Sequence, residues 1–146
     1  MNQVSKEFGW DMAHMLSGHK GLCQNVHGHT YKLVVLLEEE YGLISEGSSE
    51  GMVIDFKDLK SIVNNKVCDI FDHSFVANIH STEENEIGKF LVSKGKKVVW
   101  FEGRSTAENM AKWIYEQLSS VLPVIEIHLW ETPTNCAIHR EKRCAC

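Results

Sequence analysis

Three histidines near the amino terminus have the spacing of a metal site. His27 and His29 flank a single glycine, and His14 lies in the β-forming segment before them. Side chains at positions i and i+2 of a strand share a face, so His27 and His29 can converge on one ion and His14 can supply a third nitrogen. Three neutral imidazoles leave zinc one open position for catalysis. The pattern favours a catalytic zinc site, although it also fits a polar loop that leads into a strand.

Cys23, four residues before His27, can add a base or nucleophile to this site. Farther along the chain, Asp72 and His73 are adjacent in the segment FDHSF. A carboxylate beside an imidazole can orient and charge it, and the imidazole can then draw a proton from a thiol. Together the three residues predict a proton relay. Taken singly, Cys23 also fits an inert buried thiol, and Asp72 with His73 fits a solvated turn.

Glu131, in the segment WETPTN, stands at the end of a predicted strand with apolar neighbours. A carboxylate in such a place must be paired or must bind something. Its two oxygens can accept both hydrogens of a flat heterocycle that carries adjacent N–H and NH2 donors. We therefore expect either a ligand contact or a strand-end salt bridge at Glu131.

The first half of the chain predicts two strands and a helix. β-Forming residues fill 3–16 and 29–39, which we expect to pair as a hairpin. A Gly- and Ser-rich connection follows, and residues 52–56 resume strand character. Asp55 is expected to cap a helix, because apolar residues then recur at helical spacing as far as Val67.

The second half begins with a segment that is difficult to interpret. Residues 80–97 are polar and rich in Glu and Lys, so we expect an irregular excursion with at most one helical turn. A short strand is expected at KVVWFEG, residues 97–103. The clearest helix follows at residues 105–122, where Ser105 and Glu108 match a capping box before a continuous apolar stripe.

The chain closes with two more predicted strands. VIEIHLWET alternates at period two, and CAIHRE pairs with it across the turn TPTN. Two strands, two helices and two strands predict an α+β fold, with helices on one face of an antiparallel sheet. Long apolar strands at the edge of such a sheet would pair with other chains. We therefore expect neighbouring subunits to continue the sheet.

Composition and charge exclude several functional classes. The 146 residues suit a single domain, 1–146, and the formal charge of −5 with no basic stripe argues against nucleic acid. The longest aliphatic run, 33–37, is too short to span a membrane, and no export signal is evident, so we expect a cytoplasmic protein without a membrane partner. Five cysteines then predict reduced thiols, and the Cys144 and Cys146 tail receives no role.

Together, these motifs resemble the 6-pyruvoyl-tetrahydropterin synthase family. AHML, CQNVHGH, VIDFKDL, FDH, STAEN and WETPT occur in the order and at about the spacing of that family, and the similarity runs from about Phe8 to Arg140. The position of Cys23 before HGH, together with ETPT, is most similar to bacterial members that form 6-carboxy-5,6,7,8-tetrahydropterin for queuosine precursor biosynthesis. Animal-type members space this cysteine differently.

The resemblance implies roles for particular residues. The implied zinc ligands are His14, His27 and His29. The implied catalytic triad is Cys23, Asp72 and His73. The implied pterin contacts are Glu131, Thr106 and Glu108. Glu131 is implied to anchor the pterin ring, whereas Thr106 and Glu108 fall in a segment near the pterin. The resemblance does not say which basic residue binds the triphosphate, and the candidates are Lys20, Lys32, Arg104 and Arg140.

The resemblance also implies a fold, an assembly and a reaction. The fold is the tunnelling fold (T-fold) of ββααββ units, whose sheets join around a threefold axis into a barrel. Two such trimers stack as a homohexamer with active sites between subunits. The implied reaction converts 7,8-dihydroneopterin triphosphate into 6-carboxy-5,6,7,8-tetrahydropterin, acetaldehyde and triphosphate, with zinc as cofactor.

Two alternatives stay open at this point. The same residues can form 6-pyruvoyl-tetrahydropterin, which requires elimination of triphosphate without cleavage of the side chain. Alternatively, the protein is a non-catalytic module in which Cys23 joins the three histidines as a fourth zinc ligand, because closed structural zinc sites have four protein ligands.

Overall fold

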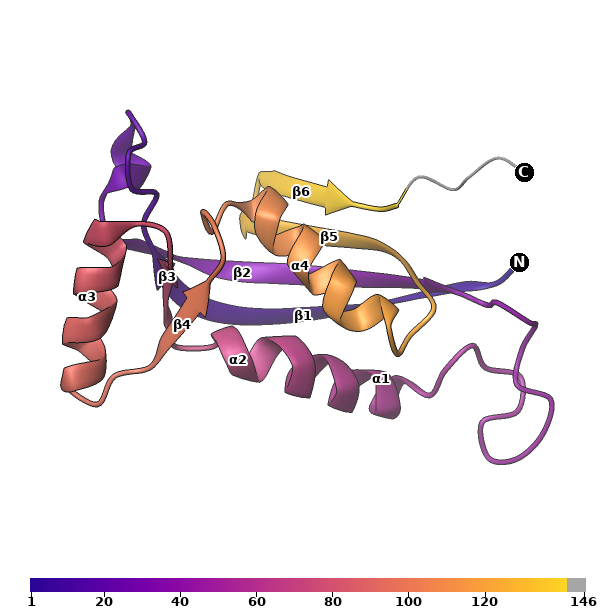
Figure 1. The fold of residues 1–146 in the computed structure, drawn as a ribbon. Helices are drawn as coiled ribbons and strands as arrows, with labels where there is room; N and C mark the ends of the chain where they lie inside the picture. Colours follow the sequence, from indigo (N-terminus) through magenta and orange to yellow (C-terminus); the bar gives the residue numbers. More distant parts are fainter. Residues whose placement is uncertain (142–146) are drawn as a thin grey trace.

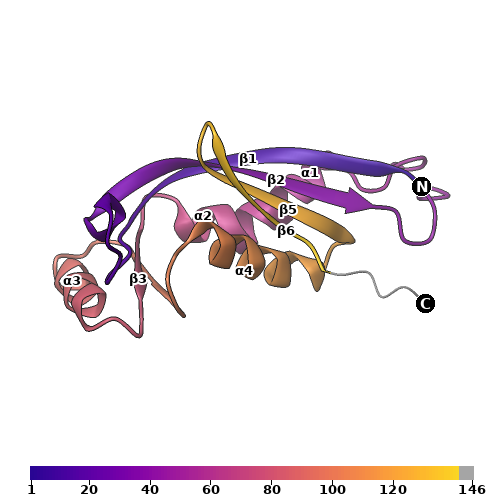
Figure 2. The same cartoon turned by 90° about the horizontal axis from the view of Figure 1, so that it is seen from above.

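The computed structural model describes residues 1–141, and the Cys144 and Cys146 tail lies outside them. Six strands form one curled sheet in the order β4-β3-β1-β2-β5-β6. The helices α1, α2 and α4 lie against one face of this sheet, and α3 lies at one end beside β3 and β4 (Figures 1 and 2). The strands are β1 (Gln3–His14), β2 (His27–Glu38), β3 (Phe75–Asn78), β4 (Val98–Phe101), β5 (Val124–Thr132) and β6 (Asn135–His139).

Helical segments occupy most of the remaining chain. The α-helices are α1 (Phe56–Val63), α2 (Asp69–Phe71), α3 (Thr82–Ser93) and α4 (Ala107–Ser119). A π-helical stretch, η2 (Asn64–Cys68), joins α1 to α2, and a 3-10 turn, η1 (Leu22–Gln24), lies between β1 and β2. As predicted, Asp55 caps α1, and its side chain accepts a hydrogen bond from the Lys57 N–H. In the described residues, no helix is long and apolar enough to cross a membrane.

The β1–β2 hairpin determines which side chains face the helices. Its antiparallel register pairs His14 with His27, Met12 with His29 and Trp10 with Tyr31. Because side chains alternate along a strand, these residues turn toward the helical layer together. Their neighbours, among them Asp11 and Thr30, turn to the opposite, helix-free face.

The predicted antiparallel core of four strands is confirmed. β5 and β6 pair as the expected hairpin, and β5 also pairs with β2 from Lys32 to Leu37. β2 thus extends beyond the pairing with β5 at the end that carries His27 and His29. Within residues 1–141, this end of β2 is paired on one side, by β1.

Two short parallel strands complete the sheet and make it mixed. β3 pairs in parallel with Ala13 and His14 of β1, and β4 pairs in parallel with β3. β4 was predicted, whereas β3 was not, because four residues directly after the FDH turn are too short to show an alternating pattern.

Two local predictions were wrong. Residues 80–97 contain the twelve-residue helix α3, whose buried residues are Glu84 and Gly88. A helix that buries a carboxylate and a glycine shows no apolar stripe, so the periodicity gave no signal. Residues 52–56 form no strand, since the chain turns there into the Asp55 cap and the start of α1.

The main core lies between the sheet and helices α1 and α4. Fully buried side chains of the sheet meet fully buried side chains of the helices: Leu33, Val35, Leu37, Ile127 and Leu129 from strands, and Leu59, Val63, Met110, Ile114 and Leu118 from helices. Each such side chain stabilises the fold by roughly 1.5–3 kcal/mol. This packing holds α4, and the segment before it, against the end of the β1–β2 hairpin that carries His14, His27 and His29.

Candidate metal centre and active site

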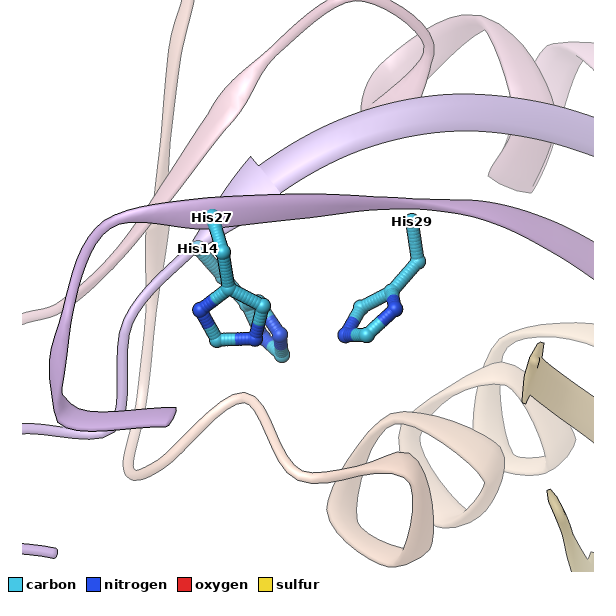
Figure 3. Close-up of side chains that lie close together, drawn as sticks. All are labelled: His14, His27 and His29. Carbon is cyan, nitrogen blue, oxygen red and sulfur yellow. The ribbon is translucent and has the colours of Figure 1, made fainter. Parts of the chain in front are cut away.

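The three predicted metal ligands come together at the end of the hairpin. The ligand atoms of His14, His27 and His29 all lie within 4.8 Å of one another. Figure 3 shows the three rings on the same side of the hairpin, with His27 and His29 on one strand and His14 on its neighbour. His14 is buried and the other two are half-buried.

Hydrogen bonds orient two of the rings. His14 Nδ1 lies 3.0 Å from both the carbonyl oxygen and the hydroxyl of Ser105, and His27 Nδ1 lies 2.7 Å from the Asn25 carbonyl oxygen. Because a carbonyl oxygen only accepts, these contacts place the proton on Nδ1 and leave a lone pair on Nε2. His27 Nε2 is buried without a hydrogen-bond partner among the described residues. A metal would satisfy this nitrogen.

The electrostatics of the cluster suit metal binding too. Burial, followed by repulsion from His27 and His29, lowers the pKa of His14 to about 4. Burial and His27 also lower the pKa of His29. Neutral imidazoles are the form that binds metal, so the lowered pKa values of His14 and His29 favour metal binding by these two residues. The donor set therefore fits a divalent transition metal.

The predicted capping box at the start of α4 was wrong. Thr106 is the N-cap, and its hydroxyl accepts from the Asn109 N–H at 3.3 Å. Ser105 is fully buried and contacts His14 instead. A sequence cannot distinguish a serine that caps a helix from one that orients a histidine, because both need only a short hydroxyl side chain.

Cys23 lies on the η1 turn between the two strands that carry the histidines. The loop closes where the Leu16 N–H donates to the Cys23 carbonyl oxygen at 2.8 Å. The pKa of Tyr31 is raised by burial, by Glu131 and, to a smaller extent, by Cys23. In the part of the chain that the structure describes, the group of possible ligands is the three histidines without Cys23.

Glu131 lies beside the histidine cluster, where Tyr31 contacts it. The Tyr31 hydroxyl donates to Glu131 at 3.5 Å, and the Tyr31 ring lies 5.5 Å from that of His29. Burial, followed by the Glu108 carboxylate, raises the pKa of Glu131, while His27 lowers it. Glu108 thus also lies close to this site, although its side chain is exposed. Tyr31 was missed by the sequence analysis, although its place two residues after His29 puts it on the same face.

Asp72 and His73 form a fixed pair at the surface. Their side chains meet at 2.8 Å from Asp72 Oδ1 to His73 Nδ1. The Asp11 N–H donates to Asp72 Oδ1 at 3.3 Å, and the His73 N–H donates to the Asp11 carbonyl oxygen at 2.7 Å. Burial raises the pKa of the Asp72 carboxyl, but the hydrogen bonds from Asp11 and His73 outweigh this effect, so the pKa of Asp72 is lowered. Lys97 Nζ donates to the Asp72 carbonyl oxygen at 2.7 Å and holds the turn from the other side.

The His73 backbone is strained. Its φ is 57°, the only positive φ of a residue other than glycine among the described residues. Such a conformation costs roughly 1–3 kcal/mol and is often found at functional sites. The side chain is 78% exposed, so the turn presents the imidazole to its surroundings rather than to the core.

One chain does not assemble the predicted triad. In residues 1–141, no hydrogen bond or ion pair joins the Cys23 thiol to Asp72 or His73. Two pockets instead meet at His29. One, of about 450 Å³, is lined by His73 and its neighbours, and the other, of about 560 Å³, is lined by Glu131 and Lys32. Both volumes lie in the range of small-molecule sites.

The four candidate triphosphate contacts have different surroundings. Lys32 Nζ lies 4.2 Å from the centre of the Trp130 ring and lines the Glu131 pocket. Arg104 donates to the Ser17 carbonyl oxygen at 2.8 Å. Arg140 pairs with Glu126 at 3.0 Å on the helix-free face. Lys20 is exposed in the loop that carries Cys23. Of these, Lys32 lines the pocket that also contains His29 and Glu131, although its place next to Tyr31 turns its side chain to the helix-free face.

Comparisons with known proteins agree with the geometry. A sequence profile described as 6-pyruvoyl tetrahydropterin synthase matches residues 3–142. The 6-carboxy-5,6,7,8-tetrahydropterin synthase of Haemophilus influenzae is 43% identical, over 97% of this chain and 100% of that protein. The protein of the same name from Rickettsia bellii is 32% identical, over 94% of this chain and 99% of that protein.

Solved structures share the fold. A Wolinella succinogenes protein, WS1659, superposes with a TM-score of 0.79 at 21% identity, over 97% of this chain and 98% of that chain. The 6-pyruvoyl tetrahydropterin synthase of Caenorhabditis elegans superposes with a TM-score of 0.68 at 24% identity, over 97% and 96%. The predicted α+β tunnelling fold is confirmed by these structures. Together with the profile and the relatives, they establish that this chain is an enzyme of the 6-pyruvoyl tetrahydropterin synthase family.

Proposed function

We propose that this enzyme is a zinc-dependent 6-carboxy-5,6,7,8-tetrahydropterin synthase of queuosine (7-deazaguanine) precursor biosynthesis. It would convert 7,8-dihydroneopterin triphosphate and one water into 6-carboxy-5,6,7,8-tetrahydropterin, acetaldehyde and triphosphate. The observation that carries the proposal is the meeting of three metal-ready histidines, a thiol and a half-buried carboxylate at one end of the hairpin. The 43% identity to the Haemophilus influenzae protein of that name supports the choice of product.

The donor set supports zinc as the metal. Three imidazoles, of which His14 and His27 have Nδ1 engaged by the protein, fit a catalytic zinc site, which keeps one position for water or substrate. Zinc held by His14, His27 and His29 would polarise the hydroxyl groups of the substrate side chain and make a neighbouring C–H proton easier to remove. The protein supplies the remaining chemistry.

Glu131 is suited to hold the pterin ring. Its carboxylate can accept from the ring N–H and the adjacent amino group at once, a bidentate contact of high specificity. A half-buried carboxylate forms stronger hydrogen bonds than an exposed one, because the local dielectric constant is lower. Tyr31 holds one carboxylate oxygen and thereby directs the group toward the histidine cluster. Thr106 and Glu108, at the start of α4, are the further candidate pterin contacts.

Cys23 is the candidate base, and His73 with Asp72 is the candidate proton shuttle. Cys23 lies on the loop between the strands that carry the metal ligands, so its thiol would be near a substrate bound at the histidine cluster. His73 would carry protons to the ring and to the leaving side chain, oriented by Asp72. A general acid or base contributes about 10²–10⁴ in rate.

This assignment leads us to propose a homohexamer with sites between subunits. His73 is 78% exposed and forms no hydrogen bond or ion pair with Cys23 within residues 1–141, which supports a site that a neighbouring subunit completes. We propose that two trimers stack and that the Asp72 and His73 turn of one subunit faces the Cys23 loop of another.

Product analysis tests the proposed function directly. Zinc-loaded protein is incubated with 7,8-dihydroneopterin triphosphate, acetaldehyde is trapped, and the pterin products are identified by mass spectrometry. The proposal expects 6-carboxytetrahydropterin and acetaldehyde in equal amounts. 6-Pyruvoyl-tetrahydropterin without acetaldehyde would place the enzyme in the other branch of the family. No turnover at all would favour a non-catalytic zinc protein.

A further inference from the structure

Helix α3 buries a carboxylate that the proposed chemistry does not use. Glu84 has no exposed surface, although charged side chains are almost never fully buried without partners. One carboxylate oxygen accepts from the Ser17 N–H at 3.1 Å, and the other accepts from the Asn78 N–H at 2.6 Å. Within the described chain it forms no ion pair with a basic residue. Two backbone N–H groups therefore hold this carboxyl group in place.

Ser17 is fixed through all three of its polar groups. Its N–H donates to Glu84, and its hydroxyl donates to Glu83 at 2.9 Å. Its carbonyl oxygen accepts from Arg104 at 2.8 Å. Arg104 directly precedes Ser105, the residue that contacts His14. The same short segment before α4 therefore holds both Ser17 and a metal ligand.

Ser17 lies near the start of the loop that carries Cys23. This loop runs from Met15 to Val26, between the metal ligands at the ends of β1 and β2. Next to Ser17, the Leu16 N–H donates to the Cys23 carbonyl oxygen at 2.8 Å. The position of the Cys23 backbone therefore depends on the position of Leu16, and Leu16 depends on Ser17. Glu84 is connected to Cys23 by two hydrogen bonds and one peptide unit.

We propose that Glu84 is a positioning residue for Cys23, and that helix α3 serves to place this carboxylate under the loop. The metal ligands lie on paired strands, whereas Cys23 lies on a loop, so the thiol needs support that the sheet does not supply. Removing the carboxylate would leave two partly buried N–H groups without a strong acceptor and would loosen the start of the loop at Ser17. The inference rests on the proposed role of Cys23 as the base, and its physical part concerns the loop alone.

The test compares Glu84→Gln with Glu86→Gln, an exposed glutamate on the same helix. Glutamine keeps the shape of the side chain but places an NH2 donor against one of the two N–H groups. We expect Glu84→Gln to lower kcat by roughly tenfold to a hundredfold, because small misplacements of a reacting group have effects of that size. Zinc content and KM should change little, and Glu86→Gln should match the wild type in all three.

A second readout separates positioning from simple stability. The rate at which iodoacetamide alkylates Cys23 is measured by mass spectrometry of the tryptic peptide 21–32, well below the unfolding temperature. We expect this rate to rise in Glu84→Gln and to stay unchanged in Glu86→Gln, since only the first releases the loop. A Glu84→Gln variant that is less stable but keeps the wild-type kcat and alkylation rate would overturn the inference.

The wild-type protein offers a check that needs no variant. The Ser17 and Asn78 amides should exchange with deuterium slowly, as measured by NMR, whereas the amide of exposed Ser48 should exchange quickly. Fast exchange at Ser17 would overturn the inference even if Glu84→Gln does not fold. If the wild type fails to turn over the pterin substrate, the proposed function fails, and the alkylation and exchange data still decide whether Glu84 holds the loop.

Discussion

The two halves of the candidate site are built in different ways. The histidine cluster lies on paired strands, is backed by Ser105 and Tyr31, and is completed within one chain. The Asp72 and His73 pair lies on a strained surface turn that is fixed by backbone contacts to β1 and by Lys97. Strand pairing therefore preorganises the metal end, whereas the turn is a rigid surface feature whose use depends on what faces it. Substitutions in the histidine cluster should therefore cause loss of metal, whereas substitutions in the Asp72 and His73 pair should cause loss of turnover alone.

The largest expected effect is at the metal end. His27→Ala should lose bound zinc and activity together, because zinc binding in proteins is worth about 10–16 kcal/mol and one of three protein ligands supplies several of these. Elemental analysis of the purified variant measures the metal, and the product assay measures the activity. Unchanged zinc content would remove His27 from the ligand set.

Cys23→Ala should separate chemistry from binding. The variant should keep zinc and pterin binding, because Cys23 lies outside the ligand cluster, and should lose about 10²–10⁴ in kcat through loss of the base. Zinc content, product affinity by calorimetry and single-turnover rate are the measurements. A wild-type rate would show that the thiol is not the base, and a loss of zinc would make it a ligand.

The metal-free cluster should make stability depend on pH. The pKa of His14 is about 4 in the folded chain and near 6.5 when unfolded, so the unfolded chain binds an extra proton between these values. Stability that is fully present above pH 6.5 is therefore lost as the pH falls toward 4, by on the order of 3 kcal/mol. Urea unfolding of chelator-treated protein at pH 7 and pH 4.5 measures this loss. His14→Gln should show a shallower dependence, and an equal dependence would mean that other groups cause it.

The smallest expected effect is at the strained turn. His73→Gly should be more stable than His73→Ala by about 1 kcal/mol, because glycine adopts a positive φ without steric cost. Both variants should retain zinc and lose turnover to a similar extent. Thermal unfolding and the product assay are the measurements. If both variants kept the wild-type rate, the turn would be structural and the two halves would not belong to one site.

Patterns within single elements were predictable from the sequence, and contacts between elements were not. The β-forming residues of β1 and β2 predicted their hairpin, the alternation of β5 predicted its pairing with β6, and HGH on one strand predicted that two histidines share a face. The cap at Asp55 was predictable as well, because it depends on one side chain and the next two residues. Ser105 and Tyr31 were missed because their importance comes from partners that are 91 and 100 residues away in the chain.

Helix α3 shows most clearly what could not be predicted from the sequence. Its residues look like a solvated polar excursion, and only the fold shows that the carboxylate of Glu84 lies under the loop that carries Cys23. Sequence alone determined the family, the order of the main strands and helices, and the chemical types at the site, since these depend on residue identity and local periodicity. Tertiary structure decided which supporting residue contacts each functional group. It also decided that Cys23 and His73 form no hydrogen bond or ion pair within residues 1–141 of one chain. Those outcomes depend on the packing of distant segments, which no local pattern records.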